Sequence, residues 1–214
     1  MIYIHDEFQR RMTSEFKYHG EITLGTHILE DTVITYLLSK KCINRDKASN
    51  YSIDLAVKIA MLHDLYTLPW QNNEAAKTKK FFNAHGFRHP IESVINSNAW
   101  YPELFKGNDS KIIIDGIVHH MFPLPVTAFE YDDNNKIELK NFELVNKLSK
   151  ENMQALIESS NRNRIGSISL SKSLYPEGII MSKADKKVSI KQIQDWGSAV
   201  ALVTGHNKTL ERKR

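Results

Sequence analysis

Apolar residues recur at three- and four-residue steps from Ser52 to Tyr66, in the stretch SIDLAVKIAMLHDLY. This spacing predicts an amphipathic or buried helix that begins at Ser52, a residue type typical of helix caps. His63 and Asp64 continue the apolar side of that helix near its end. Burying an ionised carboxylate without a partner costs several kcal/mol, so a bound cation is the most economical explanation for this pair.

The same periodicity predicts helices on both sides of this stretch. A short helix reaches about Phe16, and a longer one covers about residues 24–40 with His27 on its apolar stripe. After the central helix, Pro90 is placed to be the first residue of another helix. His89 would then lie at the entrance of that helix, with its side chain able to turn inward.

Two more helices are predicted to carry ionisable residues on an inner side. One begins near Asn108 and stops before Pro123, and it turns His120 inward. The other resumes at Gly178, and Asp185 adjoins its apolar stripe as Asp64 does in the central helix. A last amphipathic helix over about residues 193–203 closes the domain.

Residues 126–178 differ in character from the rest of the chain. They contain a polar turn, a predicted helix over about 141–158, and few strand signals, at 136–139 and 165–170. A long segment of this kind indicates an inserted cap or flap. We therefore expect a single all-α domain over 1–214, a helical bundle with an insertion at about 126–178 that includes a short β-hairpin.

Composition narrows the class of protein. The 41% of hydrophobic residues among 214 supports a full core, and no apolar run is long enough for a membrane span. Cys42 is the only cysteine, which excludes an internal disulfide and a thiolate zinc site. The formal charge of +4 is too small to indicate nucleic-acid binding. The expected location is the cytoplasm.

The inward-facing ionisable residues form an ordered set of imidazoles and carboxylates. In chain order they are His27, His63, Asp64, His89, His120 and Asp185. Nitrogen and oxygen ligands without sulfur suit divalent ions such as Mn, Fe, Mg, Ni, Co or Zn. Six ligands would be enough for one or two such ions, with a carboxylate placed between two.

This order resembles the H…HD…D pattern of the HD-domain metal-dependent phosphohydrolases. The strings HGFRHP at 85–90 and HHMFPLP at 119–125 are similar to those of a bacterial branch of that superfamily. The resemblance covers roughly residues 18–125 and 178–200. It implies an all-α core and a metal held by His27, His63, Asp64 and Asp185. It further implies a second metal held by the additional histidines, His89 and His120.

The chain departs from that branch in the long segment between His120 and Asp185. This insertion leaves the substrate open, and it leaves Asp195 as an alternative to Asp185. The residues expected to take part in catalysis are Asp64, His89 and Arg88. The cations expected to bind a substrate phosphate are Arg88, Lys186, Arg162 and Arg164.

The chemistry that these ligands permit is hydrolysis of a phosphate ester or anhydride by metal-activated water. The expected substrate is a nucleotide or another small phosphorylated molecule, without a membrane or nucleic acid as partner; a homo-oligomer stays open. The alternative function is a catalytically inactive scaffold that senses a nucleotide or binds another protein. A nucleic-acid-binding module, with affinity falling steeply with salt, is the least favoured class.

Overall fold

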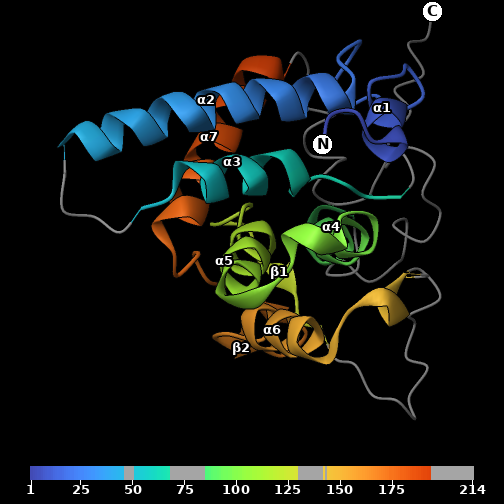
Figure 1. Ribbon diagram of the computed structural model, residues 1–214, viewed down its shortest axis with the longest axis vertical. Coiled ribbons are helices and arrows are strands. Elements are labelled where there is room, and N and C mark those ends of the chain that lie inside the picture. Colours follow the sequence, from blue (N-terminus) through green and yellow to red (C-terminus); the bar gives the residue numbers. More distant parts are fainter. Residues whose placement is uncertain (46–50, 68–84, 130–141, 143, 194–214) are drawn as a thin grey trace, which may run out of the picture.

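The structure is a computed structural model that describes residues 1–45, 51–67, 85–129, 142 and 144–193. Over these residues the chain forms an all-α bundle with one small three-stranded sheet, which confirms the predicted fold class (Figure 1). No described helix has both the length and the apolar character that a membrane span requires. The expected helix over 193–203 and Asp195 lie outside the described residues.

The helices surround one apolar core. α2 packs most extensively against α7 and α3, and α5 contacts both α3 and α7 from the other side. Two short 3-10 turns, Pro102–Leu104 and Val145–Lys147, connect the main elements. The α-helices are α1 (Asp6–Arg11), α2 (Leu24–Arg45), α3 (Ile53–Leu62), α4 (His85–Trp100), α5 (Gly107–Val118), α6 (Lys150–Ser160) and α7 (Pro176–Gln192).

The central helix α3 ends earlier than its apolar pattern predicts. Ser52 caps its start, where its hydroxyl accepts a hydrogen bond from the amide of Leu55 at 3.2 Å. The helix stops at Leu62, and two side chains of α4 bind the carbonyls that follow. Ser97 donates to the carbonyl of Leu62 and Asn96 to that of Leu65. His63 and Asp64 therefore lie in a turn after the helix, where both can still point inward.

Helix α4 begins before the residue expected to open it. It starts at His85, so Pro90 lies inside the helix and the prediction that Pro90 comes first is wrong. Nearly the whole helix is buried, and this packing outweighs the local preference of a proline for a helix start. The consequence for the site is that His85 and His89 belong to one helix, four residues apart and on the same side.

The inserted segment contributes the sheet and one helix. Strands β1 (Val126–Thr127), β2 (Arg164–Ile165) and β3 (Ile168–Ser169) pair antiparallel in the order β1-β3-β2. Gly166, at a φ of +60°, allows the tight turn of the β2-β3 hairpin. The helix expected over 141–158 is instead α6, which packs on α5. The expected strand at 136–139 lies outside the described residues.

A buried carboxylate fastens this segment to the bundle. Asp115 on α5 accepts hydrogen bonds from the hydroxyls of Ser173, at 2.6 Å, and Ser159, at 3.2 Å. It also accepts a bond from the amide of Leu174 and a charge-assisted bond from Arg162 at 2.6 Å. Because hydrogen bonds to a charged group are the stronger kind, this network holds α6 and the hairpin firmly against α5.

His119 makes this fastening sensitive to acid. The imidazole Nε2 lies 3.1 Å from the carbonyl oxygen of Ser159, and burial lowers the pKa of His119 to about 4. In the unfolded chain His119 takes up a proton near pH 6.5, whereas in the folded chain it stays neutral until the pH is lower. The free energy of unfolding therefore falls as the pH drops below about 6.5. From about pH 7.5 to about pH 5 we expect a loss of about 2 kcal/mol in the free energy of unfolding.

The measurement is urea unfolding of metal-stripped protein at both pH values, compared with a His119→Asn variant that cannot titrate there. The variant should lose about 2 kcal/mol less than the natural chain over the same interval. Equal losses in the two proteins would show that His119 does not carry this dependence.

Candidate metal centre

Four buried side chains from three parts of the chain converge beside α2. His27 and Asp31 come from α2, His63 from the turn after α3, and Asp185 from α7. One ligand atom of each lies within 4.8 Å of the others. The imidazole Nε2 of His27 is 3.1 Å from Asp31 Oδ2 and 3.6 Å from Asp185 Oδ1, and His63 Nε2 is 3.3 Å from Asp31 Oδ2.

Asp64 joins this group to a second one. Its Oδ2 faces the first group, 3.7 Å from His27 Nε2 and 3.5 Å from His63 Nε2. Its Oδ1 faces the other way, 3.2 Å from His89 Nε2 and 3.6 Å from His120 Nε2. Asp64 therefore stands between two sets of imidazoles with one oxygen directed toward each.

All four imidazoles have the same orientation, because the Nδ1 of each ring donates a hydrogen bond to a carbonyl oxygen. The Nδ1 atoms of His63, His89 and His120 donate to the backbone carbonyls of Ala60, His85 and Ile117, respectively, at 2.7–3.1 Å. The Nδ1 of His27 donates to the side-chain oxygen of Gln192 at 2.8 Å. Since Nδ1 carries the proton in each ring, the Nε2 lone pairs point into the cluster. Metal-binding histidines have this arrangement.

The pair His89 and His120 has a geometry that a cation would stabilise. Their Nε2 atoms are 3.0 Å apart. Both Nδ1 atoms already donate to carbonyl oxygens, so two neutral rings would set lone pair against lone pair. A positive charge between or beside the two rings would remove this repulsion. Asp64 Oδ1 lies close enough to both rings to bind the same cation.

The pKa shifts of His27, Asp185 and Asp64 also indicate that the cluster favours a bound cation. Burial alone would lower the pKa of His27, but the carboxylates of Asp31 and Asp185 outweigh it and raise that pKa well above its usual value. Burial alone would raise the pKa of Asp185, yet the neighbouring imidazoles bring it down to about 2. The pKa of Asp64 is also held well below its usual range, chiefly by His63 and His89. The cluster therefore keeps Asp64 and Asp185 ionised, whereas burial raises the pKa of Asp31 in spite of the imidazole of His27. Added positive charge would stabilise all three carboxylates.

The donor set fits a divalent metal ion. Within the described chain, several buried ligand atoms have no hydrogen-bond partner, namely His27 Nε2, His63 Nε2, both oxygens of Asp31, and Asp64 Oδ1. Buried polar atoms are normally satisfied, so a set of unsatisfied ligand atoms around one point fits a site that can hold a cation. The buried groups of His27, Asp31, His63, Asp64 and His120 could hold a metal ion.

The structure brings together all six residues that the sequence pattern suggested as ligands, and it adds Asp31. That residue follows His27 by four positions on α2 and is fully buried. The spacing itself was a usable signal, because residues four apart share one side of a helix. An aspartate in a helix is usually solvated, which is why the pattern of apolar residues passed over it.

Aromatic rings complete the surroundings of the cluster. Tyr18 stacks on the ring of His27, with centroids 3.7 Å apart and an interplanar angle of 16°. Tyr66 lies edge-on to His85, and the His85 ring in turn stacks 5.1 Å from His89. These ring contacts orient the imidazoles of His27, His85 and His89 within the buried site, where low exposure to solvent strengthens electrostatic interactions.

Two of the cations expected to bind phosphate, Lys186 and Arg88, adjoin candidate ligands in the sequence. Lys186 follows Asp185, is partly buried, and donates to the hydroxyl of Ser182, which itself binds the carbonyl of His120. Arg88 precedes His89, and its guanidinium lies 5.0 Å from the centre of the Phe142 ring.

Two other arginines belong to the inserted segment. Arg162 binds Asp115 and the carbonyl of Lys172. The guanidinium of Arg164 binds the carbonyl of Gly166 within the exposed hairpin. The structure therefore does not bring Arg162 or Arg164 together with the ligand cluster.

Gln192 should control metal affinity although it is not a ligand. Its amide nitrogen donates to Glu30 at 3.0 Å, which directs its oxygen to His27 Nδ1. A Gln192→Leu substitution removes that acceptor, so we expect metal affinity to fall about 10–100-fold. Titration of the apo protein with Mn²⁺ measures this, with Gln154→Leu on the exposed side of α6 as the matched control. Unchanged affinity in the Gln192 variant would contradict the role given to it.

Comparisons with family models, with curated proteins and with solved structures found no match to this chain.

Proposed function

We propose that the protein is a metal-dependent hydrolase of phosphate esters or anhydrides, acting on a nucleotide or another small phosphorylated molecule. One observation carries this: seven buried imidazoles and carboxylates from five elements turn their ligand atoms toward each other around Asp64. The resemblance to the HD-domain phosphohydrolases supports the same reaction. Two ions, one on each side of Asp64, would account for all seven side chains.

The residues divide naturally between the two positions. His27, Asp31 and Asp185 would hold one ion, and His89 and His120 the other. His63 and Asp64 lie near both groups. A bound divalent ion supplies a water of lowered pKa and positive charge that offsets the charge on phosphoryl oxygens. The anchored Nδ1 protons leave Nε2 as the ligand atom of each ring, and the ion would displace any proton held there, as ligation requires.

Two cations that adjoin candidate ligands in the sequence would bind the rest of a phosphorylated substrate. Lys186 adjoins the ligand Asp185, and Arg88 adjoins His89. Burial lowers the pKa of Lys186, but Asp185 acts in the opposite direction. A guanidinium or ammonium group next to the ligands would orient a phosphate by charge-assisted hydrogen bonds. Arg162 and Arg164 take no part, because their guanidinium groups serve the inserted segment.

The test is hydrolysis of a panel of nucleotides and sugar phosphates by purified protein supplied with Mn²⁺, Mg²⁺, Fe²⁺, Co²⁺, Ni²⁺ or Zn²⁺. Release of phosphate or of a nucleoside monophosphate, lost in a His63→Ala variant, is the expected result. A protein that binds metal and a nucleotide but turns over no member of the panel would instead be the sensor described above. A protein that binds no metal at all would contradict both functions.

A further inference from the structure

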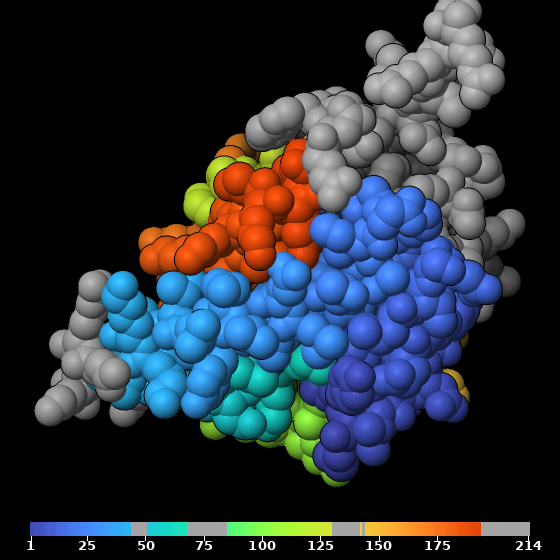
Figure 2. Space-filling view, turned by 90° about the horizontal axis from the view of Figure 1, so that it is seen from above, coloured from blue at the N-terminus to red at the C-terminus, as the bar shows by residue number. Residues whose placement is uncertain are grey.

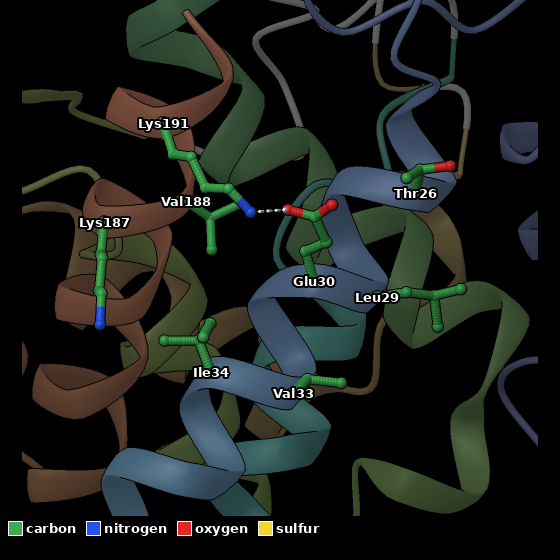
Figure 3. Close-up of a pocket in the computed structure, with 8 residues that line it drawn as sticks. All are labelled: Thr26, Leu29, Glu30, Val33, Ile34, Lys187, Val188 and Lys191. Atoms are coloured by element: carbon green, nitrogen blue, oxygen red, sulfur yellow. Dashed lines mark ion pairs between the residues drawn. The ribbon is translucent and has the colours of Figure 1, made fainter.

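A groove on the outer surface, between α2 and α7, has no role in the proposed chemistry. Its walls are the side chains of Leu29, Val33 and Ile34 from α2 and Val188 from α7, and its volume is about 350 Å³ (Figure 3). The methylene chains of Lys187 and Lys191 extend its wall on the α7 side. In the space-filling view α2 crosses the visible face and α7 lies beside it (Figure 2).

Large apolar side chains continue this surface along α2. Val33 is 57% exposed, Leu37 54% and Tyr36 43%. With Leu29 they occur at steps of three and four, which places them on one side of the helix. Single exposed apolar residues are ordinary, but a contiguous stripe beside a groove marks a surface that another molecule covers.

The rim of the groove is basic. Lys183, Lys187 and Lys191 follow each other one turn apart on the exposed side of α7. At the far end of the stripe Lys40 lies over the ring of Tyr36, with its Nζ 5.5 Å from the ring centre. Glu30 is the only carboxylate among the residues that line the groove; it accepts a hydrogen bond from Gln192 and pairs with Lys191 at 3.9 Å, so Lys183 and Lys187 keep the rim basic (Figure 3).

We propose that this groove binds an acidic amphipathic helix of a partner protein. An amphipathic helix lays its apolar side into a groove of this kind with anchors at steps of three and four. Acidic residues along its edges would meet the three lysines of α7, and such complementarity selects the partner. A second copy of the chain would set the same lysines against each other. A flat anionic membrane would leave the floor of the groove unfilled.

The probe is a synthetic peptide of about 18 residues with leucines at helical spacing and glutamates elsewhere, labelled for fluorescence anisotropy. The whole protein should bind this peptide and discriminate against one with lysines in place of the glutamates. Val33→Glu should weaken binding at least about tenfold, because it puts a like charge on the apolar floor. Lys187→Glu combined with Lys191→Glu should weaken it likewise and transfer the preference to the lysine peptide.

A control pair of substitutions outside the groove tests whether the loss of binding is specific to the groove. Lys147→Glu combined with Lys150→Glu changes the same charge at an exposed place outside the groove and should leave binding unchanged. Failure of the glutamate peptide to bind, or equal binding by all variants, overturns the inference. Sedimentation of the protein with phosphatidylglycerol vesicles would overturn the inference in favour of a membrane. A dimer that Val33→Glu dissociates would overturn it in favour of a second copy of the chain. None of these outcomes depends on phosphate hydrolysis, which the Val33→Glu variant should retain.

Discussion

An Asp64→Asn variant should lose both metal and turnover. The substitution keeps the size of the side chain but removes its charge and one of the two oxygens that face opposite sets of imidazoles. The new amide nitrogen would also direct protons at a ring nitrogen that it faces. Changes in residues behind metal ligands already cost about 10–100-fold, so we expect losses of at least about 100-fold in metal affinity and in kcat/KM.

Metal analysis after purification without chelator and a hydrolysis assay measure the two losses. The matched control is Asp54→Asn on the exposed side of α3, where the carboxylate only pairs with Lys58. Asp54→Asn should keep the metal content and activity of the natural chain. Full activity in Asp64→Asn, with the substitution verified, would remove Asp64 from the site.

Removal of metal should lower the thermal stability of the whole domain. An ion present at about 100 times its Kd stabilises the folded state by about 2.7 kcal/mol. For a chain of this size each kcal/mol shifts Tm by about 2–4 °C, so chelation should lower Tm by about 5–11 °C. The candidate ligands come from α2, α3, α4, α5 and α7, or from the turns that follow them, so metal binding would link these helices.

Differential scanning calorimetry of chelated and reloaded protein measures this shift. Re-addition of Mn²⁺ or Zn²⁺ should restore Tm in the natural chain but not in a His63→Ala variant. If Tm were the same with and without metal, and independent of His63, the buried cluster would be a purely structural network of hydrogen bonds.

The sequence pattern predicted the helices and the inward side of His27, His120 and Asp185 because a 3.6-residue period determines which residues share a side of a helix. It could not predict where α3 ends. At that end Ser97 and Asn96 of α4 donate hydrogen bonds to the carbonyls of Leu62 and Leu65. Hydrogen bonds between elements leave no trace in the local periodicity of either one.

Polar residues in buried helices explain the remaining differences. The periodicity singled out neither Asp31 nor Asp115, yet one faces the cluster and the other fastens the inserted segment. Pro90 reads as a helix start, but burial of α4 on all sides places it within the helix. In each case tertiary packing decides, and only the assembled fold shows which partners are available.

The most direct measurement is an anomalous difference map from crystals of the protein grown with Mn²⁺, recorded near the manganese absorption edge. The account predicts density between the imidazoles and carboxylates, within coordination distance of His63 Nε2 and of an oxygen of Asp64. Density confined to the protein surface, with the Nε2 atoms of His89 and His120 still facing each other, would contradict it.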